Sequence, residues 1–370
     1  MRRSLTQFSI ACLFACFFTL TSCSKKSTSG PATTDVYDPQ GIYGTTTTFA
    51  GAVSFNGPTN GIGPAASFYL PTGLVVDATG NVYVADAGNN MIRKISPVGL
   101  VSTLAGSPIK GSQDGTGTAA GFQYPAAVAI DASGNVYVAD QGNNLIRKVT
   151  SAGVVTTLAG SGSVGSANGL GTAASFYDVI GVAVDASGNV YVSDQGNNLI
   201  RKITPAGAVS TFAGSGASGS ADGTGTAASF NTPAGITIDG SGNLYVADEF
   251  NQKIRKITPA GVVTTIAGTG AVGSANGAAA TATFNYPTGV AIDANGAIYV
   301  ADHSNNKIRA ISSTGNVTTF AGTGVFGPQN GLFTACTFGS PTGVAVDPTT
   351  GNVFVADNAN NLIRKLTTKQ

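Results

Sequence analysis

Six copies of one repeat, mostly 54 residues apart, are the feature that most constrains the fold of this 370-residue chain. Each copy contains a form of Asp-x-x-Gly-Asn-x-Tyr-Val-Ala-Asp, followed by Asn-Asn-x-Ile-Arg-Lys, and most copies continue with Val-x-Thr-x-Ala-Gly. The last Asp of the first pattern recurs at positions 86, 140, 194, 248, 302 and 357. Repeated units share one continuous structure, so the length does not require several domains.

Each copy contains four short runs of residues that favour β-strands. In the second copy these are 126–131, 135–139, 145–149 and 154–159, separated by Ser-Gly, Gly-Asn-Asn and Ser-Ala-Gly. The runs are too short and too regular for βαβ units, and they are apolar on both faces, as sheets packed between sheets require. The pattern predicts an all-β fold, a β-propeller with four-stranded blades.

The two ends of the repeat array indicate a closed ring. The last copy stops after Leu366 without its fourth strand, whereas residues 45–51 form an isolated copy of that strand near the N-terminus. Pairing this strand with the last blade would close a six-bladed ring and leave no exposed edges. A β-solenoid is the structural alternative, but it would gain nothing from exchanged ends.

The combined pattern resembles a known family. Residues 287–309 read Pro-x-Gly-Val-Ala-x-Asp-x-x-Gly-x-x-Tyr-Val-Ala-Asp-x-x-Asn-Asn-x-Ile-Arg, and five other copies are close to it. This resembles the NHL repeat family, including the repeats of teneurin-like adhesion proteins, over about residues 44 to 368. The resemblance implies an interaction platform for protein, RNA or small ligands, with a minority of members being enzymes.

The N-terminus has the parts of an export signal. Arg2 and Arg3 precede an apolar run at 8–20, which is too short to span a bilayer comfortably. Leu-Thr-Ser before Cys23 resembles the lipobox of bacterial lipoproteins, which implies cleavage before Cys23 and lipid modification of its sulfur. A short N-terminal anchor with a chance cysteine is the alternative.

These observations divide the chain into three parts. Residues 1–22 form a lipoprotein signal peptide, residues 23–43 the lipidated cysteine and a flexible tether, and residues 44–368 the propeller. The expected location is the bacterial cell envelope, at the outer membrane facing the periplasm, with the cell surface as the alternative. The lipid would be the only contact with the membrane.

Net charge and cysteine content limit which partners and which covalent links the domain can have. Removal of the signal leaves 17 basic and 18 acidic side chains, so the domain lacks the basic surface of a nucleic-acid binder. Cys336 would be the one ordinary thiol, which excludes an intramolecular disulfide and indicates a small buried residue. We expect a monomer.

Residues present in every copy are first expected to serve the architecture. An arginine inside a packed strand needs a carboxylate or carbonyl partner, and the repeated Asp residues are the candidates. The earlier Asp of each copy precedes a Gly-containing turn and can accept hydrogen bonds from its amides. A ring of Asp residues could hold Ca²⁺ near the axis, but these structural roles already explain it, and we predict neither metal nor cofactor.

Residues that depart from the repeat are better candidates for a ligand site. Glu249 and Phe250 replace Gln-Gly of sister copies, and His303 occupies the equivalent place in the fifth blade. Tyr177 and Asp178 stand where other copies read Asn-Tyr or similar. We name these five residues as candidates on the face with the long Gly-rich inter-blade loops. His303, the only histidine, lacks identifiable acid-base partners, and no catalytic residue is predicted.

Three functions compete at this point. The preferred one is a non-catalytic binding or scaffold module that recognises a protein or cell-envelope glycan on its loop-rich face. The alternative is a metal-dependent lactonase- or lyase-type enzyme, which would need non-equivalent acidic or amide side chains converging at the axial channel. The third is a structural protein that mediates adhesion through its blade edges.

Overall fold

The computed structural model describes residues 43–53 and 56–369. The predicted signal peptide, Cys23 and nearly all of the predicted tether therefore lie outside the described residues. In the part that is described, no helix is long and apolar enough to cross a membrane.

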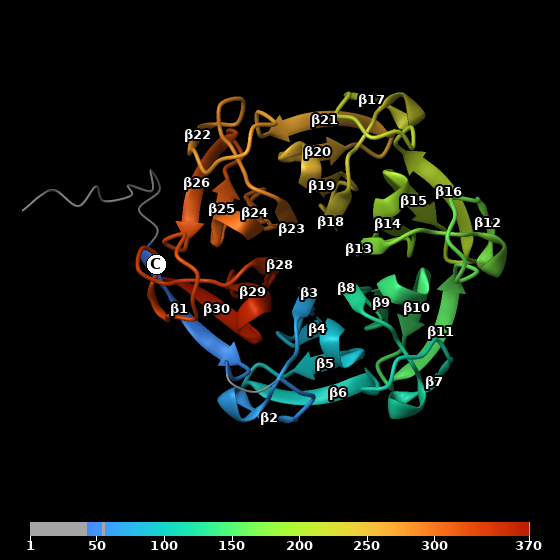
Figure 1. Ribbon diagram of the computed structural model, residues 1–370, viewed down its shortest axis with the longest axis horizontal. Helices are drawn as coiled ribbons and strands as arrows, with labels where there is room; N and C mark the ends of the chain where they lie inside the picture. Colours follow the sequence, from blue (N-terminus) through green and yellow to red (C-terminus); the bar gives the residue numbers. More distant parts are fainter. Residues whose placement is uncertain (1–42, 54–55, 370) are drawn as a thin grey trace, which may run out of the picture. The chain divides into compact units, whose positions relative to one another are not determined.

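Six β-sheets are arranged around a central axis, each forming one blade of a propeller (Figure 1). Blade 1 contains β3 (Pro71–Val76), β4 (Val82–Asp86), β5 (Met91–Ile95) and β6 (Leu100–Gly106). Blade 2 contains β8 (Pro125–Ile130), β9 (Val136–Asp140), β10 (Leu145–Val149) and β11 (Val154–Ala159). Blade 3 contains β13 (Val179–Val184), β14 (Val190–Asp194), β15 (Leu199–Ile203) and β16 (Ala208–Ala213).

The other three blades repeat this order from the axis outwards. Blade 4 contains β18 (Pro233–Ile238), β19 (Leu244–Asp248), β20 (Lys253–Ile257) and β21 (Val262–Ala267). Blade 5 contains β23 (Pro287–Ile292), β24 (Ile298–Asp302), β25 (Lys307–Ile311) and β26 (Asn316–Ala321). Blade 6 contains β28 (Pro341–Val346), β29 (Val353–Asp357), β30 (Leu362–Lys369) and the N-terminal strand β1 (Tyr43–Ala50).

The prediction of four strands per blade is wrong, because each sheet has a fifth, two-residue strand on its outer edge. These strands are β2 (Gly61–Ile62), β7 (Gly115–Thr116), β12 (Gly169–Leu170), β17 (Gly223–Thr224), β22 (Gly277–Ala278) and β27 (Gly331–Leu332). In blade 1, Gly61 pairs with Val101 and Ile62 with Leu100. The inter-blade loop thus folds back along the fourth strand and covers its free edge, in a stretch too short to show strand periodicity.

Strand β1 joins the two ends of the repeat array. It pairs antiparallel with β30, with Thr45 opposite Thr367 and Thr48 opposite Arg364. Blades 6 and 1 also meet near the axis, where the Thr342 hydroxyl donates to the carbonyl oxygen of Pro71 at 3.3 Å.

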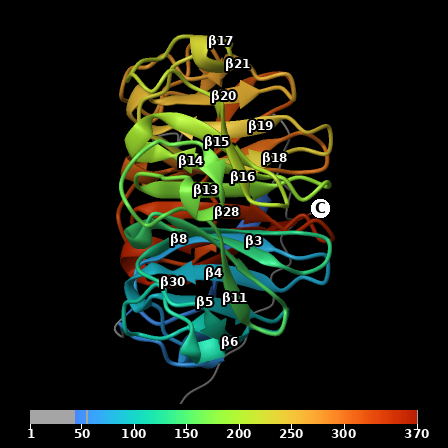
Figure 2. The ribbon, with the colours of Figure 1, turned by 90° about the vertical axis from the view of Figure 1, so that its right-hand side faces the viewer.

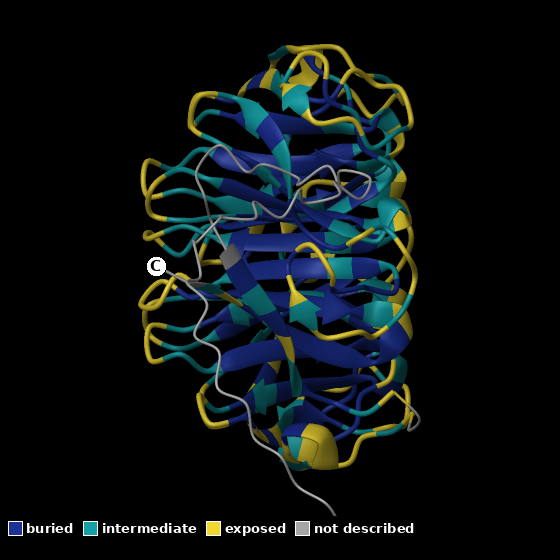
Figure 3. Cartoon of the chain, turned by 90° about the vertical axis from the view of Figure 1, so that its left-hand side faces the viewer, coloured by how far each residue is buried: buried dark blue, intermediate teal, exposed yellow. Residues whose placement is uncertain are grey.

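The core consists of six apolar clusters that lie between neighbouring blades. In one of them, Tyr83 and Ala85 of blade 1 pack with Val128 of blade 2. The side view in Figure 2 shows the strands of one blade, β21, β20, β19 and β18, following one another from the rim inwards, and Figure 3 shows that the strands are largely buried while the connecting loops are exposed. The apolar residues on both strand faces therefore serve inter-blade packing, as predicted.

A buried ion pair recurs in each blade and confirms the predicted partner of the repeated arginine. In blade 1, Nη1 of Arg93 donates to Oδ2 of Asp86 at 2.7 Å, and neither side chain is exposed. Asn89 donates to the same carboxylate at 2.9 Å. The five equivalent pairs are Arg147–Asp140, Arg201–Asp194, Arg255–Asp248, Arg309–Asp302 and Arg364–Asp357.

The second residue of the Asn-Asn pattern, which is Gln252 in blade 4, links each blade to the next. Asn144 adopts the left-handed backbone conformation, with φ +52°, and its side-chain oxygen accepts a hydrogen bond from the backbone N–H of Asp178 at 2.8 Å. Asn361 makes the same bond, at 2.8 Å, to Leu70 of blade 1. The predicted turn role of the earlier Asp is also confirmed, since Asp131 accepts from the N–H groups of Ser133 and Asn135 at 2.9 Å each.

Candidate functional site

The loop face is the face at which the second strand of each blade ends and the first strand begins. In blade 1 these two points are paired, with Pro71 opposite Asp86. A single-turn 3₁₀ helix follows the second strand at this face, as at Gln141–Asn143 in blade 2. All five residues that depart from the repeat therefore belong to segments of the loop face.

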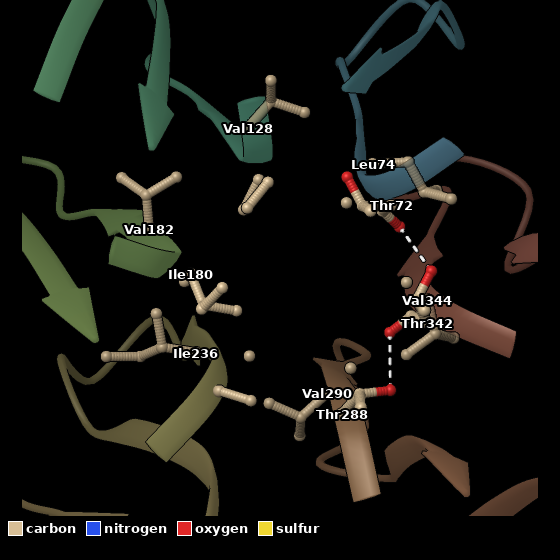
Figure 4. A pocket seen from close by; sticks show the side chains of 18 of the residues that line it. Thr72, Leu74, Val128, Ile180, Val182, Ile236, Thr288, Val290, Thr342 and Val344 are labelled. Carbon is tan, nitrogen blue, oxygen red and sulfur yellow. Dashed lines mark hydrogen bonds between the residues drawn. The ribbon is translucent and has the colours of Figure 1, made fainter. Parts of the chain in front are cut away.

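An axial cavity of about 270 Å³ lies among the innermost strands of all six blades (Figure 4). Its wall includes glycines because neighbouring strands approach closely. A Cβ atom on Gly343 would collide with the carbonyl oxygen of Thr72 in the adjacent blade, and Gly289 meets Thr342 in the same way. The volume is just below the range of about 300–1,000 Å³ that is usual for small-molecule sites.

The cavity wall has two chemically different halves. Thr72, Thr288 and Thr342 from three consecutive blades lie on one side, whereas the equivalent positions of the other three blades are apolar: Ala126, Ile180 and Ala234. Figure 4 shows Ile180 opposite the three threonines. The Thr288 and Thr342 hydroxyls donate to backbone carbonyl oxygens of the next blade at 3.0 Å and 3.1 Å.

Six equivalent positions follow the second strands at the loop face, and we call them the mouth ring. Their residues are Ala87, Gln141, Gln195, Glu249, His303 and Asn358. Three consecutive members, Gln141, Gln195 and Glu249, line the axial cavity. They belong to the blades whose wall positions are apolar. The cavity therefore combines an apolar wall with a polar, acidic mouth on the same side of the axis.

Two carboxylates and two amides form hydrogen-bonded pairs at this mouth. Nε2 of Gln141 donates to Oδ1 of Asp178 at 2.6 Å, and Nε2 of Gln195 donates to Oε2 of Glu249 at 3.2 Å. Burial raises the pKa of Glu249 to about 7, and the nearby charge of Asp178 adds to that increase. The structure thus brings together Asp178 and Glu249, which are far apart in the sequence.

Of the five candidates, only Glu249 lines the cavity, and Asp178 reaches it through its hydrogen bond with Gln141. The other three lie on the same face outside the lining. Tyr177 is exposed and packs over Gly196 of the turn beside it. Phe250 is also exposed, and its ring contacts Tyr286 edge-on with centroids 5.1 Å apart. His303 is partly buried rather than exposed, and burial lowers its pKa.

Exposed aromatic side chains recur on this face. Tyr69 and Tyr124 are exposed like Tyr177, and the Lys110 ammonium lies 4.4 Å from the centroid of the Tyr124 ring. The loop face therefore offers several flat apolar surfaces around the cavity mouth.

The sequence does not single out Gln141 and Gln195, because Gln-Gly is the regular form of the repeat at this position. Nor does it single out the threonines of the cavity wall. Comparing the six copies position by position would have found both sets, since the mouth ring holds five residue types in six positions whereas the buried Arg and Asp positions hold one each.

The model of the NHL repeat family matches residues 68–95, 122–149, 176–203, 284–311 and 338–366. The chain belongs to the NHL-repeat β-propellers. The fourth copy of this NHL propeller is not among the matched segments, and it is the copy that contains Glu249, Phe250 and Gln252 in place of the usual residues.

Longer eukaryotic proteins contain similar repeats. The NHL propeller is 32% identical over 265 residues to Protein SUPPRESSOR OF QUENCHING 1 of Arabidopsis thaliana, covering 66% of this chain and 25% of that protein. It is 29% identical over 342 residues to NHL repeat-containing protein 2 of Bos taurus, covering 82% of this chain and 47% of that protein. The chain therefore spans half or less of the length of these relatives.

A solved structure shows the same fold at low sequence identity. An auxiliary nutrient binding protein from Bacteroides thetaiotaomicron superposes with a TM-score of 0.67 at 17% identity, covering 89% of this chain and 77% of that one. At this identity the likeness concerns the fold.

Proposed function

We propose that this NHL propeller is a non-catalytic binding module that recognises a protein or glycan of the bacterial cell envelope on its loop face. The observation that carries the proposal is the mouth ring, where equivalent positions hold different side chains around a cavity. The buried network repeats in every blade and accounts for the architecture, so the varied positions are free to specify a ligand.

The exposed aromatic residues support a ligand larger than the cavity. Tyr69, Tyr124, Tyr177 and Phe250 present rigid flat surfaces beside the mouth, and such side chains are enriched where proteins bind partners. The description of a structure with this fold as a nutrient binding protein is consistent with a binding role.

The lipid anchor is part of the same proposal. Cleavage before Cys23 and acylation of its sulfur would hold the propeller at the outer membrane, facing the periplasm, as a monomer on a tether. Labelling cells with a palmitate analogue should mark the wild-type chain and leave Cys23→Ser unlabelled. Labelling of the variant would contradict anchoring through Cys23.

The binding proposal is tested with purified cell-envelope glycans and envelope proteins, using the full chain. Phe250→Gly restores the residue found at the equivalent position of three sister copies, and it should weaken binding at least tenfold. The control is Val98→Ala in the turn between β5 and β6 on the opposite face, where three sister copies have Ala. Equal loss in both variants, or no loss in Phe250→Gly, would contradict a site on the loop face.

A metal-dependent lactonase- or lyase-type enzyme is the second candidate, and one observation favours it. The mouth brings together the non-equivalent acidic and amide side chains that this function requires, namely Asp178, Glu249, Gln141 and Gln195. Their oxygens are of the type that Ca²⁺ prefers. A saturable rise in the thermal midpoint of chelator-treated protein on adding Ca²⁺, Zn²⁺ or Mg²⁺ would favour the enzyme.

A further inference from the structure

The polar groups of the axial cavity act mainly as hydrogen-bond acceptors. The threonine hydroxyls of the wall give their protons to backbone carbonyl oxygens, as Thr72 does to Pro125 at 3.2 Å. Their oxygens can still accept a hydrogen bond, and the carboxylates of Asp178 and Glu249 at the mouth only accept when ionised. A ligand group that donates hydrogen bonds therefore matches these oxygens.

The two carboxylates at the mouth have no cationic partner among residues 43–53 and 56–369. Neither Asp178 nor Glu249 forms an ion pair with a Lys, Arg or His in the described part of the chain. Instead each is supported by a neutral glutamine amide from a neighbouring blade. Because like charges near each other are unfavourable, a positive group placed between these carboxylates would relieve the repulsion.

We propose that the axial cavity binds a small ligand made of a protonated primary amine and a short apolar body. The ammonium group lies at Asp178 and Glu249, and the body lies against the apolar half of the wall at Ala126, Ile180 and Ala234. This goes beyond the proposed platform role, since the amine site would exist whether or not a glycan or protein docks on the loop face.

The proposed site also predicts a pH dependence. Burial and Asp178 place the pKa of Glu249 at about 7, so its carboxylate gains its charge as the pH rises through neutrality. An ammonium group binds the ionised form. Its affinity should therefore be about tenfold higher at pH 8 than at pH 6, because the ionised fraction rises from roughly one-tenth to roughly nine-tenths.

The test compares three probes that share one apolar body and differ in the head group: hexylamine, hexanol and hexanoate. Calorimetric titration of the full chain at pH 8 should give measurable binding for hexylamine and at least tenfold weaker binding for the other two. Equal binding of hexanol would contradict recognition of the charge, and preference for hexanoate would overturn the proposal. No binding of hexylamine at millimolar concentration would also overturn it.

Matched variants locate the site. Glu249→Gln introduces the residue of two sister blades, and it should lower hexylamine affinity at least tenfold and remove the pH dependence. Asp114→Asn makes the same charge change beside the outer strand β7, where four sister copies have Asn, and should leave affinity unchanged. Ile180→Trp should weaken hexylamine by filling the cavity. Unchanged binding in both Glu249→Gln and Ile180→Trp would place the amine elsewhere.

This outcome is separable from that of the platform proposal. Loss of hexylamine binding in Glu249→Gln with intact glycan or protein binding would support two sites. Failure of the glycan and protein panel would contradict the platform and leave the amine result standing.

Discussion

The buried network and the mouth ring occupy neighbouring positions in every blade, yet they differ in how far the six copies agree. The Asp that ends each second strand is the same in all six blades and is fully buried in an ion pair with arginine. The very next residue, at the mouth ring, is Ala, Gln, Gln, Glu, His or Asn. One position is fixed by the cost of burying an unpaired charge, and the next does not carry this constraint and varies among the blades.

The largest loss of stability should come from removing one buried arginine. Arg201→Met leaves Asp194 without its cationic partner inside blade 3, where both side chains are inaccessible to solvent. Such truncation typically costs about 3–5 kcal/mol, and urea denaturation should show a loss of this size. Asp222→Asn removes a half-exposed partner of Arg255 and should cost less than about 1 kcal/mol. Similar losses of stability in both variants would contradict the claim that buried ion pairs matter more than half-exposed ones.

The stability contributed by the mouth ring is expected to depend on pH. Folding raises the pKa of Glu249 from 4.5 to about 7, so the native state holds this proton more tightly than the unfolded state does. Stability from this group is therefore present at low pH and is lost as the pH rises through 7. Glu249→Gln should be more stable than wild type by about 1–3 kcal/mol at pH 8 and nearly equal to it at pH 4.5. A stability difference that does not change with pH would contradict the burial of this carboxylate.

Smaller, equal losses are expected when single inter-blade hydrogen bonds are removed. Asn198→Gly and Asn361→Gly keep the left-handed backbone but delete the side-chain acceptor for Thr232 and Leu70, respectively. Each should cost about 1–2 kcal/mol in denaturant unfolding. Because Asn361 joins blade 6 to blade 1, a much smaller loss there than at Asn198 would show that the junction of the ends is weaker than other blade contacts.

The smallest expected effect is a gain in stability. Within the described residues the buried Ser193 hydroxyl has no hydrogen-bond partner, and the other five copies have alanine at this position. Ser193→Ala should raise stability by about 1 kcal/mol, and Ala139→Ser in blade 2 should lower it by a similar amount. A destabilising Ser193→Ala would contradict this prediction and indicate that the hydroxyl supports the backbone at Gly181, where an added Cβ would lie 2.9 Å from it.

Most of the fold could be predicted from the sequence because the repeat occurs six times in register. The six blades and the Arg–Asp pairs follow from residues that recur in every copy. The fifth strand was not predicted, because each one is only a Gly, as in Gly61–Ile62 and Gly115–Thr116, followed by one variable residue, which is too short to show strand periodicity. Their pairing depends on where the inter-blade loop returns to the sheet.

Less of the candidate site could be predicted. Asp178 and Glu249 stood out by departing from the repeat, but nothing in the sequence showed that they meet. Their proximity depends on the rotation from one blade to the next, which also brings Gln141 to Asp178 and Gln195 to Glu249. The threonines of the cavity wall do not stand out in the sequence, because a threonine in a strand usually packs against neighbouring strands.

The central claim is that a partner docks on the loop face, where the mouth ring lies, and not on the blade edges or the opposite face. Hydrogen exchange of the full chain, with and without the glycan or protein found in the binding panel, tests it most directly. The account predicts new protection in 141–144, 177–180, 195–198 and 249–252, with no change in the opposite turns 77–81 and 96–99. Protection confined to those turns, or to the outer strands β2, β7 and β12, would contradict it.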